Sequence, residues 1–305
     1  MFSGVGACLP PWLIARINEI QIRFAWNLNL FGVKVRMNII SKKISEIKKE
    51  LAELNEIDIQ LFIDKYKNDE RAGVRNIVES AYKRKAAYDK EKERTSKMYE
   101  LERKYVTSGF ICGIDEVGRG PLAGPVCAGA CILPKNKELL YLNDSKQLSE
   151  KRREELYNII MEEKVAAACA FVSPERIDEI NILKATFEAM SFAVEKVMNQ
   201  LKEKGGFQEI EALFIDAVHV PQLERFKQFS IIKGDAKCAS IAAASIIAKV
   251  ERDRLMEEYD KKYPEYFFSS NKGYGSKDHI EALRKYGATP IHRRSFIKGI
   301  LENNG

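Results

Sequence analysis

The chain has 305 residues, which is enough for one large or two modest domains with a substantial core. Fifty Lys and Arg residues against 44 Asp and Glu give a net charge of +6, which is compatible with a polyanionic partner without establishing one. Three histidines without metal-ligand spacing argue against a zinc site and a histidine-based nucleophile. Six cysteines without a Cys-x-x-Cys pair predict free thiols in a cytoplasmic protein, and no apolar run is long enough to span a bilayer.

Residues 1–36 are apolar and poor in acids, and their positive residues follow the apolar run, whereas a signal peptide carries them before it. A transit peptide is one interpretation. We favour another, in which translation starts at Met37 and residues 1–36 are mis-annotated upstream sequence; a disordered leader is a further alternative. The mass of the native N-terminus distinguishes these, and a mature chain that begins at Met1 would contradict the second.

Residues 37–107 predict a helical N-terminal extension. Apolar residues recur there at three- and four-residue spacing among Lys, Arg and Glu, with almost no Gly or Pro. The extension is either a solvated helical segment or a grip on nucleic acid. Because its charges are mixed, we favour the first interpretation.

Composition changes at residue 108, and residues 108–305 read as a second domain that ends in a helical part. Four segments predict helices, and Ser149 is the expected N-cap of the first: 149–164, 181–201, 239–263 and 276–287. Five short apolar segments predict strands: 109–117, 125–134, 165–173, 211–217 and 229–236. This order predicts a mixed α/β sandwich rather than a regular βαβ repeat.

Three of the predicted strands end in acids, namely Asp115 with Glu116, Asp216, and Asp235. Each acid alone could cap a helix or start a turn. Four carboxylates together, without matching histidines, favour Mg²⁺ or Mn²⁺ bound through oxygen, and two such ions can support an in-line phosphoryl displacement. A glycosidase also uses paired carboxylates but needs no set of four. Since strand side chains alternate, we expect the first strand to end at Glu116, so that both neighbouring acids serve one site.

The loop "GRGPLAG" (118–124) follows the first two acids directly. It is one residue too long for the dinucleotide fingerprint and lacks the Gly-Lys-Ser/Thr of a Walker loop. Its glycines would let backbone amides reach a sugar or phosphate, with Arg119 alongside, although a plain tight turn is the alternative.

Two further positions suit contacts with nucleic acid. Tyr274 stands between two glycines and near two lysines, as expected for a ring that stacks on a base or sugar, or that packs under its own loop. Lys146 precedes a predicted helix N-terminus, where it would contact phosphate or lie in a solvated turn.

Five stretches closely resemble bacterial ribonuclease HII, of the type 2 RNase H family. In chain order they are "GIDEVGRGPLAGPV", "LNDSKQLSEKRREELY", "FIDA", "KGDAKCASIAAASIIAKVERDR" and "NKGYGSKDHIEALRKYGATPIHRRSF". The resemblance covers residues 108–297 and implies an RNase H-like fold with a five-stranded mixed sheet flanked by helices. It also implies hydrolysis of the RNA strand of RNA–DNA hybrids and incision 5′ to ribonucleotides embedded in duplex DNA, leaving 3′-hydroxyl and 5′-phosphate ends.

The resemblance also implies roles for individual residues. The catalytic carboxylates, which would hold two divalent metal ions, match Asp115, Glu116, Asp216 and Asp235. The loop that reads the ribose 2′-hydroxyl matches Gly118, Arg119 and Gly120. Tyr274 matches a tyrosine that stacks on a deoxyribose, and Lys146 a phosphate contact.

Two rival interpretations remain. An RNase HIII-type enzyme would cut hybrids but handle single ribonucleotides poorly, and a non-catalytic binding protein would keep the fold without cleavage. The Gly-Arg-Gly loop with Tyr274 argues against the first, and the complete carboxylate set argues against the second. We expect a monomer that acts in ribonucleotide excision repair without a membrane, and the C-terminal "FIKGILENNG" shows no clear docking peptide for a replication clamp.

Overall fold

The computed structural model describes residues 42–105, 109–205 and 209–302, so the predicted leader lies outside the described residues. Two compact units divide between Lys85 and Ala86. The first unit contains α2 (Ile44–Glu53), α3 (Ile59–Tyr66) and the first half of α4 (Ala72–Met98). Its apolar residues form a core of their own, which includes Ile47, Phe62 and Val74. The prediction that this region is helical is confirmed.

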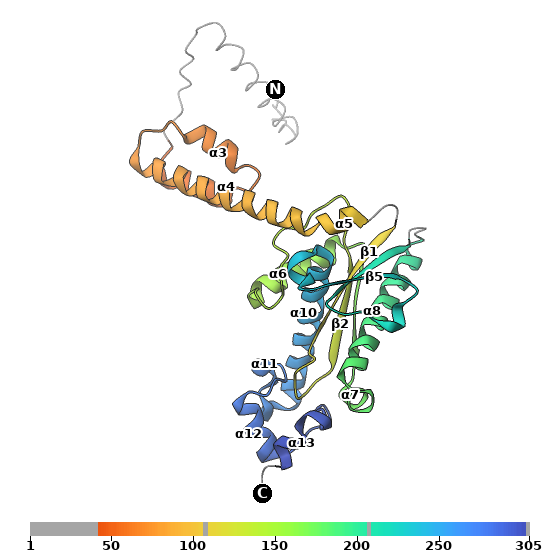
Figure 1. Cartoon of the computed structure of the whole chain (residues 1–305). Helices are drawn as coiled ribbons and strands as arrows, with labels where there is room; N and C mark the ends of the chain where they lie inside the picture. Colours follow the sequence, from red (N-terminus) through yellow and green to blue (C-terminus); the bar gives the residue numbers. More distant parts are fainter. Residues whose placement is uncertain (1–41, 106–108, 206–208, 303–305) are drawn as a thin grey trace, which may run out of the picture. The chain divides into compact units, whose positions relative to one another are not determined.

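The second unit is built on one five-stranded mixed sheet (Figure 1). Its strands are β1 (Phe110–Val117), β2 (Val126–Ile132), β3 (Ala166–Val172), β4 (Ile210–Asp216) and β5 (Lys227–Ile231). They lie in the order β3-β2-β1-β4-β5. β1 to β3 form an antiparallel meander, whereas β4 and β5 continue the sheet in parallel from β1. The predicted fold class is confirmed.

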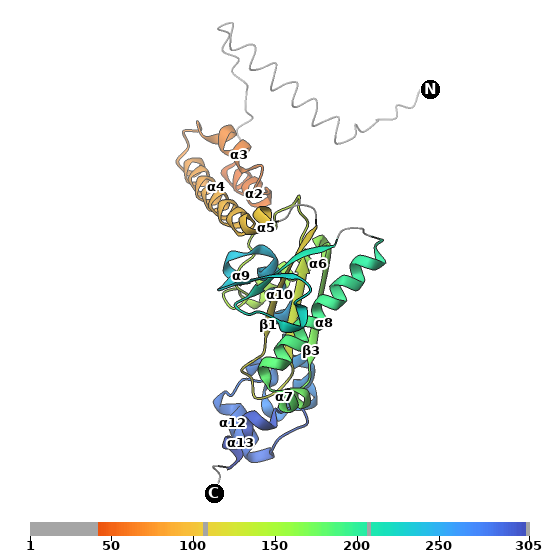
Figure 2. The same ribbon diagram turned by 45° about the vertical axis from the view of Figure 1, so that its right-hand side comes forward.

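Helices cover both faces of this sheet. α8 (Ile182–Glu203) packs on one face, and α10 (Ala239–Lys262) with α6 (Glu150–Glu163) packs on the other (Figures 1 and 2). As predicted, the Ser149 hydroxyl caps α6 by accepting from the backbone N–H of Arg152. The shorter helices are α5 (Glu100–Tyr105), α7 (Pro174–Ile180), α9 (Gly234–Lys237), α11 (Phe268–Asn271), α12 (Lys277–Tyr286) and α13 (Arg294–Glu302).

α10 lies against the backbone of the sheet. A Cβ atom on Gly113 of β1 would come within 2.1 Å of the carbonyl carbon of Ser240. One on Gly129 of β2 would come within 2.2 Å of the Ala244 oxygen. Only glycine fits at such separations, and the Ala-rich first half of α10 provides the matching flat surface. The helix therefore has one fixed depth on the sheet.

Two predicted strand ends are wrong. β1 does not end at Glu116, because Asp115 and Glu116 both pair with β2, opposite Gly129 and Ala128. The last predicted strand, 229–236, ends at Ile231, since Lys233 adopts a left-handed conformation (φ 57°) that breaks the extended backbone before α9.

The cysteines agree with the prediction of free thiols. Among the described residues, four free thiols are buried and Cys169 is half-buried; the buried ones are Cys112, Cys127, Cys131 and Cys238. No helix in the described part of the chain is long and apolar enough to cross a bilayer.

Candidate active site

The sheet brings the first three predicted acids to one edge. β1 and β4 run parallel, with Ile114 opposite Ile215, so that Asp115 and Asp216 follow at the carboxyl ends of adjacent strands. Asp115 is 6% exposed, and Asp216 is half-buried. The Asp216 carboxylate accepts a hydrogen bond of 2.7 Å from the backbone N–H of Gly234, which ties the start of α9 to the end of β4.

Asp115 and Glu116 meet although strand alternation gives them opposite faces. Asp115 lies on the α10 face, like Gly113, and its Oδ1 accepts the Glu116 N–H at 2.8 Å. Burial raises the pKa of both carboxyls; the charge of Glu116 raises that of Asp115 further, and Asp216 raises both. Nearby polar groups, the Ser245 hydroxyl at Asp115 and Arg119 at Glu116, oppose these rises. The two groups therefore repel each other within one site.

Asp235 joins this group from α9, not from a strand end as predicted. Its pKa is raised by burial and by the charges of Asp144 and Asp216, and lowered by Lys146. Residues in left-handed conformations follow Asp216 and precede α9, namely Ala217 (φ 53°) and Lys233 (φ 57°). Such backbone strain persists only where the surrounding structure enforces it.

The donor set fits a divalent cation by its chemistry. All four groups are carboxylates, the ligands that Mg²⁺ and Mn²⁺ prefer, and Glu116 Oε2 is buried without a hydrogen-bond partner. A buried acceptor of this kind is costly unless something binds it. Across the described residues, no three His, Cys, Asp or Glu side chains already stand in position to hold a metal ion. The carboxylates are gathered but do not form a closed set of ligands.

Two fully buried arginines hold the Gly-rich loop beside the carboxylates. Arg293 donates to the Gly118 and Arg119 carbonyls at 2.5 and 2.8 Å, and also to the Gly124 carbonyl. Arg252 donates to the carbonyls of Ala123, Pro125 and Lys272. Gly118 has φ 86°, and a Cβ there would lie 2.2 Å from Arg252 Nε. The loop is therefore rigidly supported, which is more than a plain tight turn requires.

Tyr274 lies against this loop and is 46% exposed, so it does not pack beneath its own loop. A Cβ on Gly120 would lie 3.6 Å from its Cε1. The two loops are joined by hydrogen bonds from the Leu122 and Ala123 N–H groups to the Gly273 carbonyl. Lys146 is exposed in the turn before α6, on the side of Asp235.

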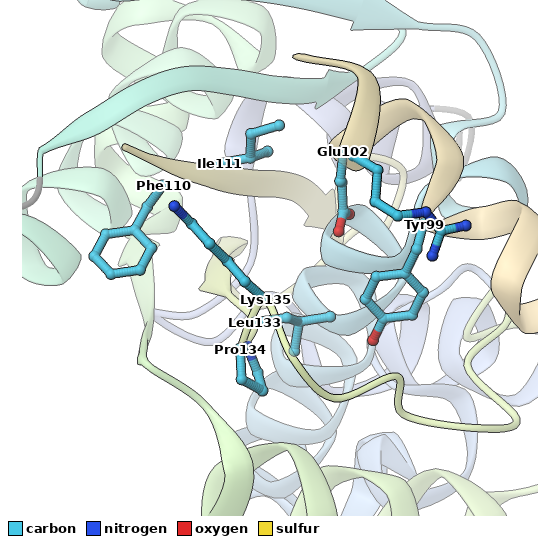
Figure 3. Close-up of a pocket in the computed structure, with 8 residues that line it drawn as sticks. Tyr99, Glu102, Phe110, Ile111, Leu133, Pro134 and Lys135 are labelled. Atoms are coloured by element: carbon cyan, nitrogen blue, oxygen red, sulfur yellow. The ribbon is translucent and has the colours of Figure 1, made fainter. Parts of the chain in front are cut away.

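Two hollows of the second unit lie away from the acids. One, of about 300 Å³, lies at the start of β1 and contains Tyr99, Glu102 and Ile111 (Figure 3). The other, of about 630 Å³, lies beside α10 and is lined by Phe171, Tyr259 and several glutamates. Neither contains any of the predicted site residues.

Several supporting residues escaped the sequence-based prediction. Arg252, Arg293 and Ser245 lie in the motifs quoted above, but a helical or loop pattern does not reveal that an arginine is buried. Asp144 had a signal in the same segment as Lys146, since it is a further acid in "NDSK". Its charge acts on Asp235 only because the fold brings their segments together.

Comparisons with known proteins assign the chain to a family. The family model for ribonuclease HII matches residues 112–299, and the model for the ribonuclease HII N-terminal domain matches residues 43–106. The chain belongs to the ribonuclease HII family. It is 53% identical to ribonuclease HII of Lachnoclostridium phytofermentans over 87% of this chain and 99% of the relative. It is 44% identical to that of Clostridioides difficile over 85% and 99%.

A solved structure supports the fold. The crystal structure of ribonuclease H2 from Pyrococcus horikoshii OT3 is 27% identical, covers 64% of this chain and 98% of its own, and superposes with a TM-score of 0.51. Family membership makes this chain an enzyme, an RNase H-type endonuclease that acts on RNA–DNA hybrids. Divalent-metal dependence is general for ribonuclease HII.

Proposed function

We propose that this member of the ribonuclease HII family also incises duplex DNA on the 5′ side of single embedded ribonucleotides, leaving 3′-hydroxyl and 5′-phosphate ends. The observation that carries the proposal is the place of the Gly118–Gly120 loop, between the carboxylates and the exposed ring of Tyr274. This loop begins two residues after Glu116. A loop that binds one ribose would therefore fix the position of the cut relative to that sugar.

The orientation of the loop suits a 2′-hydroxyl. A peptide group is planar and trans, so its N–H points away from its C=O. Because Arg293 binds the carbonyls of Gly118 and Arg119 from the buried side, the N–H groups of Arg119 and Gly120 point the other way. Two backbone donors can thus meet the 2′-oxygen, the group that distinguishes RNA from DNA.

In this proposal Asp115, Glu116, Asp216 and Asp235 hold Mg²⁺ or Mn²⁺, two ions per site. When bound, such ions supply an activated water and stabilise the leaving oxygen. The protein's own residues orient the strand: the loop holds the ribose, Tyr274 stacks on the neighbouring deoxyribose, and Lys146 binds a phosphate. Positioning of this kind accounts for much of the acceleration in phosphoryl transfer.

The test compares three duplexes in Mg²⁺ and in Mn²⁺: all-DNA, DNA with one ribonucleotide, and an RNA–DNA hybrid. We expect no cut in the first, one incision 5′ to the ribonucleotide in the second, and several cuts in the third. Product ends are assigned by ligation and by phosphatase treatment. Cleavage of the hybrid without incision at the single ribonucleotide would favour the HIII-type interpretation.

A variant tests the carboxylate assignment. Asp115→Asn should abolish cleavage of both ribonucleotide-containing duplexes, because a neutral amide cannot replace a carboxylate ligand, while binding measured by fluorescence anisotropy stays within about threefold. Asp64→Asn, at an exposed position of α3 in the first unit, is the matched control and should cleave normally. Normal turnover by Asp115→Asn would refute the metal-site assignment.

A further inference from the structure

Two of the three histidines meet in the interior of the C-terminal helical part. His279 lies on α12, and His292 lies in the turn before α13; they are 0% and 2% exposed. Their Nε2 atoms are 3.0 Å apart. The rings of Tyr266 and Phe268 pack around both imidazoles. Neither histidine has a place in the proposed metal site or in substrate contact.

The partners at each end of this pair determine where the protons are. His279 Nδ1 lies 2.8 Å from the Tyr274 carbonyl, which can only accept, so this nitrogen carries a hydrogen. At the other end, the Thr289 N–H donates to His292 Nδ1 at 3.0 Å, so this nitrogen accepts. A neutral His292 therefore carries its hydrogen on Nε2 and donates it to the bare Nε2 of His279.

Both imidazoles are neutral in this arrangement. Burial lowers the pKa of both rings, and for His292, where His279 and Arg294 add to the effect, the pKa falls to about 4. The neighbouring Tyr266 has a raised pKa and stays uncharged. A proton added to His279 would place two N–H groups against each other across 3.0 Å, so this hydrogen-bond arrangement disfavours the charged imidazolium form of His279.

The pair lies between Tyr274, which contacts substrate in the proposed function, and the segment that anchors the Gly-rich loop. His279 holds the carbonyl of Tyr274, the residue whose exposed ring lies beside Gly120. His292 directly precedes Arg293, whose guanidinium holds the Gly118 and Arg119 carbonyls. One chain of hydrogen bonds thus links Tyr274 to the segment that anchors the Gly118–Gly120 loop.

We propose that His279 and His292 form a neutral relay with a fixed proton order, in which His279 is a positioning residue that sets Tyr274 for stacking. This inference rests on the proposed role of Tyr274. It assigns the relay an effect on substrate binding and not on the chemical step, since neither ring touches the carboxylates.

Nuclear magnetic resonance of the intact wild-type protein tests the proton order directly. With only three histidines, long-range ¹H–¹⁵N spectra resolve each ring, and exposed His219 serves as the internal reference. We expect a neutral Nδ1–H tautomer for His279 and a neutral Nε2–H tautomer for His292 at pH 6.5. The opposite tautomers, or a charged ring at this pH, would overturn the relay.

Kinetics with the single-ribonucleotide duplex test the positioning. His279→Leu and His279→Asn both lose the bond to His292, but the amide of Asn can still donate to the Tyr274 carbonyl. We expect His279→Leu to raise KM roughly three- to tenfold with little change in kcat, as for one lost hydrogen bond, and His279→Asn to recover most of this loss. Equal effects of the two variants would indicate a merely structural role and contradict the proposal.

A double-mutant cycle separates this inference from the proposed function. In a Tyr274→Ala background the ring is absent, so His279→Leu should raise KM no further. Tyr274→Ala with an unchanged KM would contradict the stacking role itself, and the inference with it. A raised KM for Tyr274→Ala beside an unchanged KM for folded His279→Leu would overturn the relay alone. The spectroscopic test applies even if the leucine variant does not fold.

Discussion

At the scale of single residues, the buried carboxyl of Asp115 lowers the stability of the folded protein while it provides a candidate metal ligand. Asp115 is almost fully buried, and the charges of Glu116 and Asp216 raise its pKa further. The folded chain without metal therefore holds these carboxyl groups close together at an electrostatic cost, whereas the unfolded chain would separate them. Such repulsion is the condition for strong cation binding, because a cation removes it.

Asp115→Asn should therefore stabilise the metal-free protein. The pKa of Asp115 is higher in the folded state than its ordinary value of 3.8, so the folded state loses stability as pH rises from that value through the folded pKa. Removing the charge should raise the free energy of unfolding by about 1 kcal/mol or more at pH 8.

Urea unfolding in a chelator measures this difference. The gain should shrink as pH falls toward 3.8 and vanish below it, where Asp115 is protonated in both states. It should also shrink at saturating Mg²⁺, which stabilises the wild type by binding to its folded form. An Asp115→Asn protein that is less stable than the wild type in the chelator at pH 8 would contradict the repulsion argument.

At the scale of residues, the sequence predicts the acidic site residues better than the buried residues that hold the site's loops in place. Asp115, Glu116 and Asp216 end apolar segments, where a charge needs an explanation. Arg293 and His279 give no such signal, because their local patterns are those of any polar turn or helix. Only the fold shows that Arg293 is fully buried against three carbonyls.

At the scale of elements, α5 supports the helix on which the site is built. Cys238, the N-cap of α10, provides no side-chain cap. Glu102 of α5 acts instead: its Oε1 accepts the N–H of Ser240 at 2.7 Å and lies 3.1 Å from the Cys238 sulfur. This carboxylate therefore caps a helix 136 residues further along the chain, directly after α9, which carries Asp235.

Glu102→Ala should lower the free energy of unfolding by about 1–2 kcal/mol, the usual cost of a lost N-cap. It should also raise the metal concentration needed for half-maximal cleavage, because α9 and Asp235 follow the start of α10. Glu100→Ala, at an exposed position of the same helix, is the matched control and should change neither. Equal urea midpoints for the two variants would show that Glu102 does not act as a cap.

Local sequence predicts most elements but misjudges the ends of two strands, each for a different reason. β1 extends through both acids because β2 lies opposite them, and a pattern within β1 does not show its partner. β5 stops early because Lys233 turns left-handed, a conformation that few non-glycine residues adopt and composition does not announce. Glu102 was missed because its partner is so distant in sequence.

At the scale of the whole molecule, the boundary between the compact units lies earlier in the chain than the change in composition. Composition changes near residue 108, whereas the compact units divide after Lys85. Residues 86–105 belong to the second unit, where Met98 and Tyr99 are buried and the Tyr99 hydroxyl accepts the Leu139 N–H at 3.0 Å. The last part of the segment that matches the N-terminal domain model thus contributes to the core of the second unit.

Two truncations should consequently differ. A chain that starts at Ala86 keeps Met98, Tyr99 and Glu102, whereas one that starts at Thr107 loses all three. We expect the shorter chain to be less stable by about 4 kcal/mol or more, since two large buried side chains are removed. Urea unfolding of both, beside the full-length protein, measures this. Equal stabilities would show that 86–106 is dispensable to the core.

In the proposed function, one helix would set the distance between the Gly-rich loop and the carboxylates. Ser245 of α10 stands beside the Asp115 carboxylate, and Arg252, seven residues later, holds the reading loop. Seven residues are about two turns, which places both on one face about 10 Å apart. α10 lies at a fixed depth on the sheet, set by Gly113 and Gly129, so in the proposed function it would hold the recognition loop at a constant distance from the carboxylates. Under this proposal, the position of the incision relative to the ribonucleotide would follow from the spacing of two residues along one helix.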